Sequence, residues 1–137
     1  MPRIDFRAVI IAFAAEFAVD LLIGALLFHV FAGDRITPEM TDAQFLELRR
    51  WVLENTPCLA WLVLSGSATT VGGGYLAARL AKRIPYYHGL AIGIAGIIDI
   101  VLEWDREFTG LGWLGVATTI PLALVGAHFA RKQMETA

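Results

Sequence analysis

Four long stretches of this chain carry almost no charge, and each is long enough to cross a membrane as a helix. They cover roughly residues 8–31, 57–78, 86–104 and 111–130. A helix needs about 20 predominantly apolar residues to cross the hydrocarbon of a bilayer. Hydrophobic residues make up 57% of the chain, above the roughly 45–50% of soluble domains. The sequence therefore predicts an all-α, polytopic membrane protein with four transmembrane helices.

The charge and cysteine content argue against several classes of protein. The net charge of −2 offers no basic surface, so we expect no nucleic-acid partner. The single cysteine, Cys58, rules out an intrachain disulfide and a cysteine-based metal cluster. Four spans leave little of the 137 residues for a soluble part. We therefore expect residues 1–137 to form a single transmembrane domain in contact with the lipid bilayer.

Basic residues gather on one side of the predicted membrane. Seven of the eleven lysines and arginines fall on the side that holds both termini: Arg3, Arg7, Arg79, Lys82, Arg83, Arg131 and Lys132. Short loops rich in these residues stay in the cytoplasm, so we expect both termini of this multi-pass protein to be cytoplasmic. The ending of the second span, Gly-Gly-Tyr-x-Ala-Ala-Arg from Gly73 to Arg79, resembles that of many small bacterial membrane proteins. This resemblance indicates a bacterial-type inner (plasma) membrane and implies no function.

The long outer loop, residues 32–56, contains signals for a short amphipathic helix. Thr37-Pro38-Glu39 is one candidate start, with proline in the first turn. Thr41 and Gln44 offer a second start as a capping box. The apolar residues that follow share one helical face, and they are Phe45, Leu48 and Val52. Such a helix either covers the ends of the bundle or serves to dock a partner or to gate access.

Two segments of the chain repeat one another. Ala68-Thr69-Thr70-Val71 recurs 49 positions later as Ala117-Thr118-Thr119-Ile120. The acids Glu16 and Asp20 align in the same way with Asp99 and Glu103, 83 positions later. A duplicated helical hairpin explains both alignments, with residues 1–84 as the first repeat, the loop 32–56 inserted in it, and residues 85–137 as the second. Chance similarity is the alternative, because apolar spans draw on few residue types.

The acids inside the predicted spans are the strongest functional signal. Glu16 with Asp20, and Asp99 with Glu103, are each four residues apart, so each pair lies on one face of a helix. A carboxylate at the centre of a bilayer costs roughly 2.5–3.5 kcal/mol on insertion scales, and such residues usually face the interior of a bundle. We therefore expect these four side chains to point inward.

The predicted depths bring further oxygen atoms to the level of two of these acids. Asp20 and Asp99 fall near the middle of their spans, with Glu16 nearer the cytoplasm and Glu103 nearer the outside. Pro121 lacks an N–H group and frees a backbone carbonyl in the fourth span. The hydroxyls at the same level come from Thr69, Thr70, Thr118 and Thr119. This all-oxygen set suits a proton or a bound hard cation of unassigned identity, and we expect no organic cofactor.

Small residues recur every four positions in the second and third spans, at Gly66, Thr70, Gly74 and Ala78, and at Gly89 and Gly93. Such stripes let helix backbones approach closely. They predict either tight packing within one bundle or a contact between copies in a homo-oligomer.

The three histidines do not form one site in this topology. His29 falls near the outer end of the first span, whereas His88 and His128 fall near the inner face. Only the last two lie at depths that would allow them to share a ligand.

The sequence leaves three functions open. The first is a proton- or cation-handling transporter or channel, assembled as an oligomer, with the acids and threonines as its site. The second is a non-catalytic membrane subunit or scaffold in which protonated acids bond to hydroxyls of the second span and hold the helices together. The third, which we favour least, is a membrane enzyme that acts on a lipid or quinone, with Glu103 or Asp105 as its acid-base group.

Overall fold

The computed structural model describes residues 4–102 and 110–136, and these residues contain helices and no strands. The all-α prediction is therefore confirmed. The four long helices are α1 (Phe6–Ala32), α3 (Thr56–Ala81), α4 (Pro85–Leu102) and α5 (Gly110–Glu135). A short 3₁₀ turn, η1 (Gly33–Arg35), and the helix α2 (Asp42–Glu54) connect α1 to α3.

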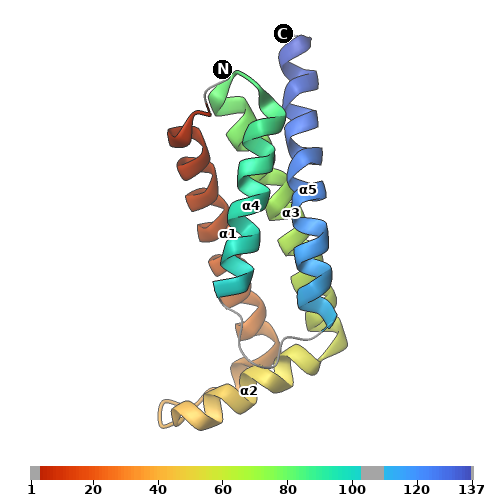
Figure 1. Ribbon diagram of the computed structural model, residues 1–137. Helices are drawn as coiled ribbons and strands as arrows, with labels where there is room; N and C mark the ends of the chain where they lie inside the picture. Colours follow the sequence, from red (N-terminus) through yellow and green to blue (C-terminus); the bar gives the residue numbers. More distant parts are fainter. Residues whose placement is uncertain (1–3, 103–109, 137) are drawn as a thin grey trace.

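The long helices run side by side, and α2 lies across one end of them (Figure 1). The start of α1 and the end of α5 both lie at the opposite end of the molecule. Helix α3 packs against α1, α4 and α5, whereas α1 contacts α4 only sparsely. The bundle is therefore a tight group of three helices, α3 to α5, with α1 attached mainly through α3.

Three of the described helices are long and apolar enough to cross a membrane, not the four that the sequence predicts. These segments are Phe6–Arg35, Pro85–Leu102 and Trp113–Glu135. Helix α3 has the length, with 26 residues, but the segment 65–74 is mostly serine, threonine and glycine, which lowers its hydropathy. The composition of α3 therefore does not qualify it as an apolar span, and the prediction of four such spans is wrong at this helix.

The helix of the long loop is α2, and it starts at the second of the two candidate positions, with Thr41 as its cap. The Thr41 hydroxyl accepts from the backbone N–H of Gln44, and the Gln44 side chain accepts from the backbone N–H of Thr41, so the predicted capping box is confirmed. The other candidate start, Thr37-Pro38-Glu39, is wrong: this segment is a turn, closed by a hydrogen bond from the Met40 N–H to the Thr37 carbonyl.

The apolar face of α2 packs against the ends of α1 and α3. Leu48 and Val52 are buried together with Ala32 and Cys58. The ring of Phe45 lies 5.4 Å from that of Phe28 on α1, centre to centre. This helix therefore covers one end of the bundle and fastens the last turns of α1.

A hydrogen bond between distant parts of the chain fastens the other end of α1. The Asp5 carboxylate caps the helix by accepting from the N–H groups of Arg7 and Ala8, at 3.0 and 3.3 Å. The Asp5 N–H itself donates to Nε2 of His88 on α4, at 2.9 Å. His88 is fully buried, and its Nδ1 faces the Ile84 carbonyl at 3.2 Å. Because Nε2 accepts, the imidazole is neutral and Nδ1 carries its proton.

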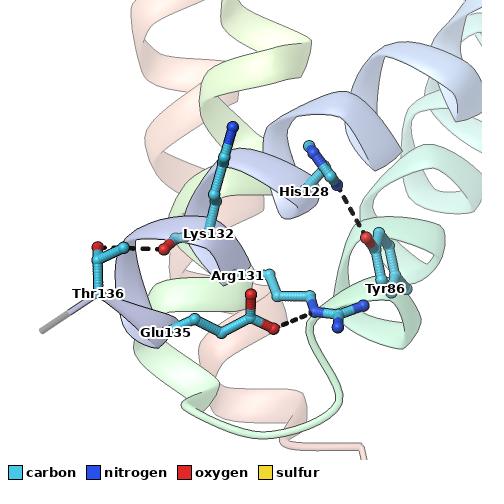
Figure 2. A network of polar contacts seen from close by, with 6 residues as sticks. All are labelled: Tyr86, His128, Arg131, Lys132, Glu135 and Thr136. Atoms are coloured by element: carbon cyan, nitrogen blue, oxygen red, sulfur yellow. Dashed lines mark hydrogen bonds and ion pairs between the residues drawn. The ribbon is translucent and has the colours of Figure 1, made fainter.

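Polar contacts also join α4 to α5 near the end that holds both termini (Figure 2). The Tyr86 hydroxyl lies 2.9 Å from Nδ1 of His128. Arg131 donates to Glu135 at 2.7 Å, and its guanidinium lies 5.6 Å from the centre of the Tyr86 ring. His128 thus contacts Tyr86, while His88 contacts Asp5, and the two imidazoles do not form a shared site.

Glycines bring α5 into close contact with α3 and α4. A Cβ added to Gly74 would overlap the Ala123 carbonyl, and one added to Gly89 would lie 2.7 Å from the Cβ of Ala127. At Gly93 an added Cβ would lie 2.8 Å from the Cα of Ile120, and Ala78 is fully buried. Gly66 differs, since an added Cβ there meets nothing within 4 Å. These contacts of the small-residue stripes lie within one bundle.

Candidate functional site

A cavity of about 490 Å³ lies between the four long helices, and we call it the acidic cavity. Each of the four helices contributes polar side chains to its lining. The polar residues are Glu16 and Asp20 from α1, Ser67 and Thr70 from α3, Asp99 from α4, and Thr118 and Thr119 from α5. The structure therefore brings most of the candidate binding residues together at one cavity, from all four long helices.

Asp20 is held in the cavity wall by a hydrogen bond between helices. The Thr69 hydroxyl donates to the Asp20 carboxylate at 2.7 Å, which joins α3 to α1. The same hydroxyl lies 3.2 and 3.0 Å from the carbonyls of Ser65 and Gly66 on its own helix. Thr69 is buried and Asp20 is partly buried, so this hydrogen bond is partly covered by the bundle. It fixes the orientation of the Asp20 side chain relative to α3.

Glu16 lies one helical turn from Asp20 and has a different environment. Its Oε2 is buried and has no hydrogen-bond partner among the described residues. The carboxyl group packs against Gly73, where an added Cβ would overlap Oε2, and the Thr70 side chain lies beside it. A charged oxygen without a donor is costly inside a protein, so this site favours either a protonated carboxyl or a compensating cation.

Asp99 reaches the same cavity from α4. It lies close enough to Glu16 and Asp20 for the three charges to interact. Among the described residues that line the acidic cavity, none is lysine, arginine or histidine. The described lining of this cavity therefore supplies no positive charge to balance these carboxylates.

The threonines of α5 line the cavity but use their hydroxyl protons within their own helix. Thr118 donates to the carbonyl of Leu114 at 2.8 Å, and Thr119 donates to that of Gly115 at 2.7 Å. Ser67 behaves in the same way, with a 2.7 Å bond to Val63. The oxygen atoms of such hydroxyls keep a free lone pair and act as acceptors toward a ligand.

A second cavity of about 880 Å³ lies toward α2, and we call it the α2-side cavity. It adjoins the acidic cavity, because both are lined by Phe17, Asp20, Leu62 and Asp99. Its described lining also contains two basic side chains, His29 and Arg49. The two carboxylates thus lie where the cavities meet, and the basic groups belong only to the α2 side.

The remaining candidates are placed differently. Glu103 and Asp105 lie outside the described residues. Gly66 lines the acidic cavity instead of making a close helix contact. Among the residues that the structure describes, no three His, Cys, Asp or Glu side chains converge as metal ligands.

Sequence reasoning did not identify the apolar wall of the acidic cavity. Phe13 and Phe17 flank Glu16 on α1, and their rings stack with centres 6.5 Å apart. Gly126 was also missed, although an added Cβ there would overlap the Val71 carbonyl of α3. An apolar or small residue in a helix that is apolar on every side carries no periodic signal, so only the fold distinguishes these positions from their neighbours.

No protein-family model, no curated protein and no solved structure matches this chain.

Proposed function

We propose that this chain is a small integral membrane protein that handles protons or a cation at the acidic cavity, as a transporter or channel. The observation that carries the proposal is the convergence of Glu16, Asp20 and Asp99 on one cavity without a basic residue in its described lining. Each intramembrane carboxylate costs roughly 2.5–3.5 kcal/mol on insertion scales. Residues of that cost usually mark an ion or proton path, and apolar side chains would fill the space more cheaply.

We also propose that α3 crosses the membrane with the other three helices. It lies along all of them, and residues 56–78 carry no charged side chain. Its serine, threonine and glycine residues include those that line the cavity or contact α5, so its low hydropathy reflects an interior position in the bundle. Four spans would also agree with the two ends of the chain lying at the same end of the bundle.

The internal repeat fits this proposal. The Thr69 hydroxyl contacts the carbonyls of Ser65 and Gly66, and 49 positions later the Thr118 hydroxyl contacts those of Leu114 and Gly115. This bonding agrees with the sequence repeat, although helical threonines commonly bond in this way and Thr136 does so outside the repeat. Under this proposal each hairpin supplies carboxylates from its first helix and hydroxyls from its second.

A homo-oligomer completes the proposal. On the open side of the acidic cavity, Phe17 and Val63 are 41% and 42% exposed, so a single copy does not enclose its own acids. A second copy seated on this side would shield the carboxylates from lipid. Mass measurement of the protein in native-like nanodiscs tests the assembly directly.

Reconstitution into proteoliposomes tests the function. An imposed pH gradient should drive proton flux, read by an internal pH-sensitive dye, in the parent protein. Asp20→Asn and Asp99→Asn should each reduce the flux to that of protein-free liposomes, because an amide neither takes up a proton nor binds a cation by charge. Asp34→Asn is the matched control, since Asp34 is exposed in η1 and lines neither cavity.

Two results would contradict the proposal. One is a parent protein that conducts neither protons nor Na⁺, K⁺ or Ca²⁺ under any gradient while it remains folded. The other is unchanged flux in the Asp20→Asn/Asp99→Asn double variant. Circular dichroism in detergent separates both results from simple misfolding.

A further inference from the structure

We propose that the occupant of the acidic cavity is a lipophilic organic cation, that is, a monovalent onium or ammonium ion on an aromatic or aliphatic body. This inference rests on the proposed function of the cavity and names the class of cation. It is carried by the size of the cavity, the chemistry of its walls and the position of its acids.

The volume of the cavity is too large for a bare ion. At about 490 Å³ it falls within the range of roughly 300–1,000 Å³ typical of small-molecule sites. Each water molecule occupies about 30 Å³ in the liquid. An inorganic ion would therefore need many accompanying water molecules to fill this space. Such water would lie against a wall that is mostly apolar.

The ligand geometry argues in the same direction. Ca²⁺ takes about 6–8 oxygen ligands at close range, and Mg²⁺ demands a near-octahedral shell. The described residues place no three acidic, histidine or cysteine side chains in a metal-binding arrangement. Glu16, Asp20 and Asp99 line the cavity without forming such an arrangement, so together they attract a positive charge but do not enclose a metal ion.

The apolar side chains of the cavity lining suit the apolar part of an organic cation. Phe13 and Phe17 lie on the same helix as the acids, before and after Glu16, and their stacked rings line the cavity. The face of an aromatic ring attracts a cation, by about 0.5–2 kcal/mol depending on solvation. Leu62, Ile100 and Leu122 line the cavity as well. An occupant with one positive charge and an apolar surface would interact favourably with both the carboxylates and the apolar side chains of the lining.

The distribution of charge orients the occupant. The acidic cavity has carboxylates and no basic side chain in its described lining, whereas the α2-side cavity also contains His29 and Arg49. The acidic cavity therefore attracts a cation more strongly than the α2 side does, because Arg49 offsets part of the negative charge on that side.

Binding of tetraphenylphosphonium to the full chain in detergent tests the inference, by equilibrium dialysis or calorimetry. Tetraphenylborate has nearly the same shape and the opposite charge, so it serves as the matched ligand control. We expect saturable binding of tetraphenylphosphonium at about one site per cavity, with at least tenfold weaker binding in Asp20→Asn and in Asp99→Asn. Asp34→Asn should bind like the parent. Phe17→Leu, which preserves the acids and most of the side-chain volume, should weaken binding by a smaller factor.

Three outcomes would overturn the inference: no saturable binding of tetraphenylphosphonium, equal binding of tetraphenylborate, or unchanged affinity in both aspartate variants. If the variants fail to fold, binding to the parent protein is measured as a function of pH instead. Lower pH must weaken binding of tetraphenylphosphonium, because protonated carboxyl groups no longer attract the cation. Flux of protons without binding of tetraphenylphosphonium would leave the proposed function standing and overturn only the class of occupant. Binding without any flux would support the occupant and contradict transport.

Discussion

The hydroxyl of Thr69 on α3 donates a 2.7 Å hydrogen bond to the carboxylate of Asp20 on α1, across the interior of the bundle. This contact joins α1 to α3 at the wall of the acidic cavity, which Asp20 lines. Polar groups paired in this way hold helices together and also set the direction in which a carboxylate points. The bond therefore links the stability of the bundle to the geometry of the candidate site.

Thr69→Val tests how much this hydrogen bond contributes to the stability of the bundle. The substitution keeps the shape of the side chain and removes the donor, so we expect a loss of about 1–2 kcal/mol in the free energy of unfolding. Thr118→Val is the matched control, because the Thr118 hydroxyl contacts only carbonyls of its own helix. Reversible unfolding in mixed detergent micelles measures both. Equal losses in the two variants would show that the bond to Asp20 contributes nothing of its own.

Gly74→Ala and Gly66→Ala should change stability in opposite directions. An added methyl group at Gly74 meets the backbone carbonyl of Ala123, which cannot move aside, so we expect a loss of about 1–3 kcal/mol. At Gly66 the same methyl group meets nothing, and the higher helix propensity of alanine should raise stability by about 0.5–1 kcal/mol. Thermal unfolding in one detergent compares them. A stable Gly74→Ala variant would contradict the close contact between α3 and α5.

His88→Leu should release the start of α1. The substitution removes the acceptor for the Asp5 N–H and the donor that faces the Ile84 carbonyl, at a cost of about 1–3 kcal/mol. Hydrogen exchange followed by mass spectrometry should show faster exchange in the first turns of α1. His29→Leu removes an imidazole that is exposed, and it should leave exchange in those turns unchanged. Unaltered exchange in His88→Leu would mean that the capping by Asp5 alone holds the helix.

The sequence predicts the parts of this molecule that depend on local chemistry. The Thr41–Gln44 capping box sets the start of α2, and the apolar stretches set the positions of the long helices. The spacing of Glu16 and Asp20 predicts that both acids share one helical face, and both line one cavity. Each of these predictions needs only neighbours within about four residues.

The parts that the sequence does not predict depend on which helix faces which. Whether Gly74 contacts α5, and Gly66 contacts nothing, follows from helix positions that no periodic pattern encodes. Phe17 lines the cavity for the same reason, although it resembles every other apolar residue of α1. The low hydropathy of α3 reflects its serine, threonine and glycine content, and hydropathy alone does not report which of these side chains the bundle covers.

The two ends of α1 are held by His88 and by α2, whereas its central turns are held mainly by α3, through packing and the Thr69–Asp20 hydrogen bond. Asp5 binds His88 at one end, Phe28 packs on Phe45 at the other, and contacts with α4 are sparse between them. A rigid swing of α1 would break the contacts at both ends, whereas a bow in its central turns would keep them and break only the Thr69–Asp20 hydrogen bond and the packing beside it. Those central turns carry Glu16 and Asp20, so such a bow would also move these acids apart from Asp99.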